Sequence, residues 1–261
     1  MKTTLFRDFG TFANLIAQNA PSRTVKGDED WAFGKDWPDE DTTREGILAG
    51  RAPASVEAAY DTARQSIAAA MEASDTQGVT RRRVHRFADD GDGVNIDRYL
   101  SGRADCWDST TATKTARIVR IGFNICVSAV NGAADFARLA ANCAAACDWL
   151  TVRGFGVEVV GIAANPAKTT HRKYDNWVYR WTIKGPTDPL DVGAIMAFGA
   201  PGALRRFVLD QAEVDLPDMK WNAAANYYWN NERRAACGVD YVISRQWTGA
   251  NCKDILEGIE H

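Results

Sequence analysis

The sequence contains no apolar run long enough to cross a membrane or to form the core of a signal peptide. Arg7 and Asp8 interrupt the first apolar stretch. No later stretch approaches the roughly 20 apolar residues that a membrane-spanning helix needs. We therefore expect no membrane partner, and we expect the protein to stay in the compartment where it is made, the cytoplasm.

The common catalytic signatures are also absent. The chain has three histidines, one of which is its last residue, and it has no GxSxG, HExxH or GxxxxGK[ST] motif. Gly154 and Gly156 lack the third glycine of a dinucleotide fingerprint, and they precede a predicted strand instead of a helix. These absences argue against the usual hydrolases, zinc proteases, P-loop proteins and dinucleotide enzymes, and they favour a protein that is not an enzyme.

Cysteine pairs and a basic charge excess are missing as well. The six cysteines are dispersed without a CxxC pair, so we expect reduced thiols. Cys143 and Cys147 are four residues apart on a predicted helix, where small core filler is a better interpretation than a metal pair. The formal net charge of −3 gives no overall field that would attract nucleic acid. With 46% apolar and 25% charged residues, the composition is that of a globular protein.

The clearest pattern in the sequence lies between residues 114 and 164. Residues 116–128 alternate and then become continuously apolar, which is typical of a strand buried on both faces. Residues 135–152 are rich in alanine and predict a packed helix, and residues 157–163 predict a second buried strand. This spacing indicates a right-handed crossover between two parallel strands.

The remaining segments predict helices and strands around this unit. Before it we expect an amphipathic helix over residues 4–20 and a Trp-rich acidic loop, followed by helices over 43–50, 53–73 and 94–100. After it we expect a strand over 177–184, helices over 191–200 and 202–209, a strand over 239–244 and a final helix. The fold class is therefore α/β, with a doubly wound, mostly parallel sheet in residues 111–261 and an α-helical N-terminal extension in residues 1–110.

The end of the first central strand is the candidate binding position. Asn124, Cys126 and Ser128 occupy alternate positions there, so their side chains are expected to point the same way. The segment Asn124-Ile125-Cys126-Val127-Ser128 resembles the Asp-x-Ser-x-Ser that ends the first strand of von Willebrand factor A-type (VWA) domains and holds a divalent metal. The resemblance implies a VWA-like fold, with Thr187 and Asp188 near the remaining ligand positions.

The departures from that motif change the expectation about metal. Asn124 replaces the charged aspartate and Cys126 replaces the first serine, and a neutral amide with a thiol makes a poor Mg²⁺ site. We therefore expect a degenerate site without a cofactor, with Mg²⁺ as the alternative.

Two longer stretches carry a second resemblance, which covers nearly the whole chain. VNIDRYLSGRADCW at residues 94–107 and PLDVGAIMAFGAPGALRRFVL at residues 189–209, together with the acidic Trp/Gly segment, are similar to a group of uncharacterised tailed-phage proteins. The resemblance implies that a phage encodes the protein, which would then act in the host cytoplasm or in the virion. It implies no activity.

Two clusters of arginines and aromatics have alternative interpretations. Arg205 and Arg206 could bind a phosphate, or could hold a helix end against Asp210, which we favour. A later cluster combines aromatic rings with arginines, as do both protein interfaces and platforms for single-stranded nucleic acid, and the net negative charge favours an interface. Its members are Trp221, Tyr227, Tyr228, Trp229, Arg233 and Arg234.

These observations predict a non-enzymatic interaction or assembly protein. Its protein partner would meet the loops around residues 128–132 and 185–188, at the carboxyl end of the sheet. The two resemblances imply an AAA+ ATPase or virion components as partners. The alternative is a protein that binds or processes nucleic acid or nucleotides, using the arginines at 81–86, Arg205, Arg206 and the aromatic cluster at 221–234.

Overall fold

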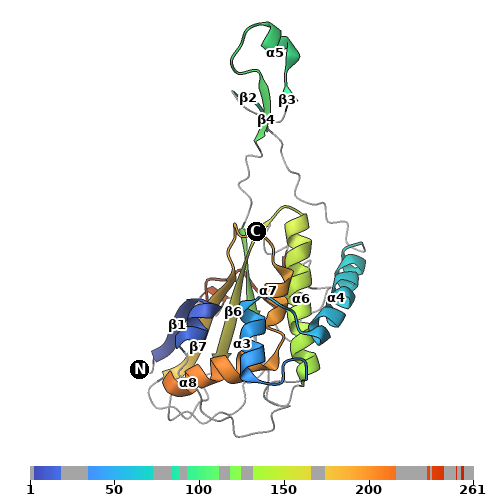
Figure 1. Cartoon of the computed structure of the whole chain (residues 1–261). Helices are drawn as coiled ribbons and strands as arrows, with labels where there is room; N and C mark the ends of the chain where they lie inside the picture. The colour runs from blue at the N-terminus through green and yellow to red at the C-terminus, as the bar shows by residue number, and fades with distance from the viewer. Residues whose placement is uncertain are drawn as a thin grey trace.

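The computed structural model describes residues 3–18, 35–72, 84–88, 93–111, 118–124, 132–165, 174–215, 234–235, 237–243, 251 and 254–255. These residues form a mixed α/β body around a five-stranded sheet, and a three-stranded sheet with one short helix. Figure 1 shows the smaller sheet and its helix at the top, clear of the body.

The large sheet has the strand order β1-β7-β6-β5-β8. It contains β1 (Thr3–Thr11), β5 (Ile118–Asn124), β6 (Gly156–Asn165), β7 (Tyr174–Lys184) and β8 (Tyr241–Ile243). The pairs β1–β7, β5–β6 and β5–β8 are parallel, and only β6–β7 is antiparallel. The predicted α/β class with a mostly parallel sheet is therefore confirmed.

The central strand–helix–strand unit is also confirmed. β5 leads into α6 (Ala133–Val152), which leads into β6, and the two strands pair in parallel register. Eleven of the 20 residues of α6 are buried, which explains its alanine content, because small side chains allow close approach on several faces. The helix ends at Val152 and is followed by Arg153 and Gly154; the φ of Gly154, +90°, lies in the left-handed region that glycine adopts without strain.

The core of the body lies between the sheet and the helices on one of its faces. Trp181 of β7 is fully buried there and stacks on Phe198 with ring centroids 6.0 Å apart. Gly161 on β6 makes room for the indole, since a Cβ at this position would lie 2.2 Å from the ring. The helices that contribute to this core or cover it are α1 (Phe12–Gln18), α3 (Glu40–Leu48), α4 (Ala54–Glu72), α6, α7 (Val192–Ala197), the π-helix η1 (Ala203–Val208) and α8 (Leu209–Asp215).

The helix expected over residues 4–20 is wrong in its first half. Residues 3–11 form β1, which pairs with β7, and only Phe12–Gln18 is helical. Gly10 marks the change, with a φ of +67° and a backbone N–H that donates to Asp8 Oδ1 at 2.8 Å. Pairing with β7 decides the conformation of this segment, because Leu5 and Phe9 pack on the body equally well from a strand.

The N-terminal segments share their core with the rest of the body. Phe9, Ile47 and Val56 belong to the same buried cluster as Val119 and Phe136. The core therefore crosses the boundary that the sequence places at residue 110.

The second sheet belongs to a separate small unit. It has the order β2-β4-β3, with β2 (Val84–Ala88) and β3 (Gly93–Val94) both antiparallel to β4 (Trp107–Thr111). The short helix α5 (Ile96–Leu100), which the sequence predicted over residues 94–100, lies between β3 and β4. We call residues 84–88 and 93–111 the small module. No described helix of the body or of the small module is long and apolar enough to cross a membrane.

Candidate interaction surface

The predicted metal position is represented in the structure by one of its three strand residues. Asn124 ends β5 and is 5% exposed, whereas Cys126 and Ser128 lie outside the described residues. Within the described parts of the chain, no three His, Cys, Asp or Glu side chains form a group that could hold a metal ion. The degenerate site at this strand end stays a prediction.

Thr187 and Asp188 lie at the opposite edge of the sheet from Asn124. Asn124 is in register with Ile162 and through it with Arg180, four residues before β7 ends. Because β7 runs antiparallel to β6, the loop after Lys184 emerges beside the start of β5. Residues 185–188 therefore lie at the opposite end of the strands from Asn124, contrary to the expectation that they meet there.

A buried lysine holds the loop at that edge. Lys184 donates from Nζ to the carbonyl oxygens of Val157 at 2.7 Å and Gly185 at 2.8 Å. Its burial lowers the pKa of the amine. Asp188 accepts from the Gly185 N–H at 2.8 Å, which closes the turn. The side chains of Lys184 and Asp188 therefore both shape this turn.

Arg206 stabilises the packing of two helices. Its guanidinium lies 2.6 Å from Glu40 of α3 and 2.5 Å from Asp210 of α8. The interpretation of this residue as a support for a helix end against Asp210 is therefore confirmed. Arg205 lies over the Phe136 ring, 4.9 Å from its centroid, and burial lowers the pKa of Arg205 to about 10.

The aromatic cluster predicted at residues 221–234 lies outside the described residues, except for its last member. Arg234 donates from Nη1 to the carbonyl oxygen of Asp240 at 3.4 Å. The predicted interface at this cluster stays a prediction.

The small module carries a concentration of exposed apolar side chains that the body does not have. Ten large apolar side chains are exposed among the described residues, and five of them lie within the 14 residues from 94 to 107. These five are Val94, Ile96, Tyr99, Leu100 and Trp107. The body buries its large apolar residues against one another, so the module is the candidate interaction surface.

Three of these side chains come from one side of α5. Ile96, Tyr99 and Leu100 are 68%, 64% and 76% exposed. Their spacing of three and four residues places them next to one another on a helix. We call these three residues the apolar face of α5.

Hydrogen bonds fix the short helix that carries this face. Asn95 caps α5 by accepting from the Arg98 N–H at 3.1 Å, and its own N–H donates to the Cys106 carbonyl at 2.7 Å. At the other end, the Ser101 hydroxyl donates to the Asp97 carbonyl at 2.6 Å. Gly102 then turns the chain with a φ of +69°.

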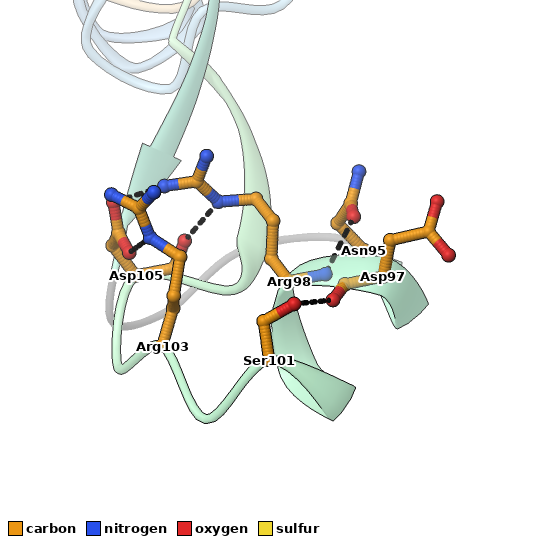
Figure 2. Close-up of polar contacts among 6 residues, drawn as sticks. All are labelled: Asn95, Asp97, Arg98, Ser101, Arg103 and Asp105. Carbon is orange, nitrogen blue, oxygen red and sulfur yellow. Dashed lines mark hydrogen bonds and ion pairs between the residues drawn. The ribbon is translucent and has the colours of Figure 1, made fainter.

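Figure 2 shows a cluster of charges beside α5. Arg98 and Arg103 both pair with Asp105, Arg103 at 3.1 Å, and Arg98 also donates from Nε to the Asp105 carbonyl at 3.0 Å. Although desolvation would raise it, the hydrogen bonds from these two arginines hold the pKa of Asp105 below its ordinary value. The carboxylate of Asp97 points away from this cluster, on the other side of the helix.

The sequence reasoning placed α5 correctly but did not single it out as a site. The available signal was three large apolar residues at helical spacing in a helix of only five residues, between the polar caps Asn95 and Ser101. A helix of a single turn offers few neighbouring residues against which these side chains could be buried.

Comparison with known proteins gives a family without a known activity. No curated protein and no solved structure shows significant similarity to the chain. A family described as "Domain of unknown function (DUF7192)" matches residues 3–258, almost the full length. The chain therefore belongs to the DUF7192 family.

Proposed function

We propose that this protein is a non-enzymatic interaction or assembly protein that contacts its protein partner through the small module. The observation that carries the proposal is the exposure of Ile96, Tyr99 and Leu100 on a helix held in place by its own polar contacts. Large apolar side chains gathered on a protruding element are typical of protein contact sites, in which a few such residues supply most of the binding free energy.

The body supports this proposal as a scaffold. Two of the charged groups considered for ligands make internal contacts: Arg206 with Glu40 and Asp210, and Asp188 with the Gly185 N–H. The small module, with its exposed apolar side chains, is therefore the part of the described chain that we assign to the partner contact.

The sheet topology supports the finer assignment to a VWA-like, doubly wound fold. In the part β7-β6-β5-β8, numbering from β5, the chain fills the sheet in the order 3-2-1-4, which is the first part of a doubly wound order. The resemblance to VWA domains suggests an AAA+ ATPase as partner, and the resemblance to tailed-phage proteins suggests a virion component. A copy of the chain itself is a third partner of the same class.

The test uses the full chain as tagged bait against a lysate of the source cells that also contains untagged copies of the chain. We expect the wild type to retain a protein that the triple variant Ile96→Ser/Tyr99→Ser/Leu100→Ser does not retain, because serine removes the apolar contact and leaves the helix caps in place. The matched control is Val152→Ser, which alters an exposed apolar residue of the body, 73% exposed.

Two other results would count against the proposal. Equal retention by the wild type and the triple variant would show that the module is not the contact. A salt-dependent shift of single-stranded DNA or RNA by the purified chain, with no protein retained, would favour the nucleic-acid alternative.

Tight binding of Mg²⁺ in calorimetry would argue against the degenerate metal site.

A further inference from the structure

The charge around α5 indicates which kind of partner its apolar face fits. We propose that this face docks a basic amphipathic segment of another protein, in which lysines or arginines surround large apolar side chains. This inference rests on the proposed function and adds the chemistry of the partner to it.

The first argument is the net charge of the chain that carries the apolar face. We call residues 88–108, from the end of β2 through α5 to the start of β4, the tip of the small module. Its only cationic side chains are Arg98 and Arg103, whereas it contains six aspartates. Two positive and six negative charges give −4, which is more negative than the −3 of the whole chain. The aspartates are at positions 89, 90, 92, 97, 105 and 108.

The second argument is the position of Asp97 beside the apolar face. Arg98 and Arg103 both pair with Asp105, so the two cations of the tip meet at one aspartate. The carboxylate of Asp97 points away from that cluster, and it forms no ion pair within the described parts of the chain. Asp97 precedes Leu100 by three residues, which makes the two neighbours on the helix. A cation of the partner can therefore pair with Asp97 while an apolar side chain contacts Leu100.

Three of the aspartates are attached close to the same place. They lie between Ala88 and Gly93 and outside the described residues, but both flanking residues pair with β4, at Trp107 and Asp108. Because one residue spans at most ~3.6 Å, the Cα atoms of these aspartates lie within about 7 Å of a flanking residue. The Debye length at physiological ionic strength is about 8 Å, so their charge acts on a partner at the tip.

The basic residues of this part of the sequence are attached at the opposite end of β2. Arg81–Arg83 precede Val84, which pairs with Thr111, whereas Ala88 at the other end pairs with Trp107. Four steps along a strand cover about 14 Å, which exceeds the Debye length. The charge is therefore separated along β2, and the acidic end is the one that leads to α5.

This charge selects among the occupants of the apolar face. It repels nucleic acid and anionic membranes, and it also repels the tip of a second copy, which carries the same −4. A basic segment is attracted, its apolar side chains can contact Ile96 and Leu100, and the exposed ring of Tyr99 can receive a lysine or an arginine on its face. An apolar centre with complementary charges at its rim is the usual anatomy of a protein interface.

The test measures the binding of three synthetic peptides to the full chain by fluorescence anisotropy. The first peptide, of about 14 residues or four helical turns, combines leucine and lysine at helical spacing. The second has glutamate in place of each lysine, and the third has serine in place of each leucine. The leucine/lysine peptide should bind about tenfold more tightly than either of the others, because it alone supplies both apolar contact and positive charge. Raising the salt concentration from about 50 mM to about 500 mM should weaken its binding.

Substitutions in the chain assign this binding to α5. Leu100→Ser should weaken binding of the leucine/lysine peptide about tenfold, because it removes an apolar contact. Asp97→Lys should weaken it about fivefold and should strengthen binding of the leucine/glutamate peptide, because it reverses the charge beside the face. The matched controls are Val152→Ser and Asp61→Lys, at exposed positions of the body, and both should leave the dissociation constants unchanged. The far-UV circular dichroism of each variant confirms that the body is folded.

Three outcomes would overturn the inference. The first is a leucine/lysine peptide that does not bind, or that binds no more tightly than the leucine/glutamate peptide. If the full chain still loses a lysate protein on Ile96→Ser/Tyr99→Ser/Leu100→Ser, the proposed function stands and only the basic chemistry of the partner is excluded.

The second is binding that Asp61→Lys weakens and that Leu100→Ser and Asp97→Lys leave unchanged, which would place the contact on the body. The third is an association that Leu100→Ser abolishes but that involves another occupant. Sedimentation equilibrium of the chain would reveal a second copy, and co-sedimentation with vesicles of phosphatidylcholine and phosphatidylglycerol would reveal a lipid surface.

Discussion

The body and the small module are held together by different interactions. In the body, Trp181 and Phe123 are almost fully buried, and the helices and the sheet share one apolar core. In the small module, Cys106 is the only apolar side chain buried among those whose exposure is described, and α5 is held by its cap and by ion pairs. The body therefore owes its stability to apolar burial, whereas α5 owes its shape to polar contacts.

This difference explains where the exposed apolar side chains lie. A core needs several layers of secondary structure, and a three-stranded sheet with a one-turn helix cannot supply them. Polar contacts can nevertheless fix a backbone while leaving the side chains between them exposed. Ile96, Tyr99 and Leu100 are exposed in this way, so of the two described regions the one with the smaller core presents this group of exposed apolar side chains.

Both regions contain a carboxylate that pairs with two arginines, but the two ion-pair clusters differ in their exposure to solvent. In each region one carboxylate serves two arginines: Glu40 pairs with Arg44 and Arg206 in the body, and Asp105 pairs with Arg98 and Arg103 in the module. The side chain of Arg206 is 5% exposed, whereas that of Arg103 is 56% exposed. Substitutions at these positions should therefore have unequal effects.

The largest expected effect comes from the tryptophans of the two regions. Trp181→Ala should lower the free energy of unfolding by about 3–5 kcal/mol, because it empties a packed site between Gly161 and Phe198. Trp107→Ala, at a residue that is 37% exposed, should lower it by less than about 1 kcal/mol. Urea denaturation measures both, and Trp181→Phe replaces the first variant if that does not fold. Equal losses would show that the module is part of the cooperative core.

The second comparison uses the arginines. Arg206→Leu should lower the free energy of unfolding by about 2–4 kcal/mol, because it leaves Glu40 and Asp210 without their shared partner in a largely buried site. Arg103→Leu should change it by less than about 1 kcal/mol, since its ion pair is exposed to solvent. Thermal unfolding followed by circular dichroism distinguishes the two, and a larger loss for Arg103→Leu would contradict the assignment.

A smaller and local effect is expected at the cap of α5. Asn95→Ala removes the acceptor for the Arg98 N–H and should lower the free energy of local opening by about 1 kcal/mol. Hydrogen exchange at the amides of residues 98–101 should become about fivefold faster, while the amides of α6 should keep their rates. Faster exchange throughout the body would show that the two regions open together.

The smallest effect concerns pH. Although burial would raise it, hydrogen bonds from Arg206 and Arg44 hold the pKa of Glu40 below its ordinary value of 4.5. A lowered pKa in the folded state stabilises the protein above pH 4.5, and this contribution is lost as the pH falls below 4.5 and through the folded pKa. Global stability should therefore decrease in this window, and Glu40→Gln should flatten the decrease. A Glu40→Gln profile as steep as that of the wild type would contradict this role.

Much of the local structure could be predicted because its causes are local. Asn95 predicted the start of α5, and the alanine-rich segment predicted α6 between two parallel strands. Gly154 predicted where α6 ends, since the left-handed backbone there suits glycine. The error over residues 4–20 arose because the same apolar residues can face a core from a strand or from a helix, and pairing with β7 decides between them.

The candidate site was less predictable because it depends on the direction of the strands and on which side chains remain exposed. The position of Thr187 and Asp188 relative to Asn124 follows from the antiparallel direction of β7, to which the alternating pattern of that strand is equally suited. The exposure of Ile96, Tyr99 and Leu100 depends on what does not pack against α5, and apolar residues at helical spacing usually indicate a buried face.

The sequence by itself determined the α/β class, the crossover unit, most helices and the absence of common catalytic motifs, because spacing, capping and glycine act over a few residues. Tertiary structure alone decided that β1 joins the sheet, that residues 185–188 lie at the opposite end of the strands from Asn124, and that α5 is left exposed. These features depend on strand direction and on packing between segments that are distant in the sequence. Such contacts cannot be inferred from any short stretch of residues.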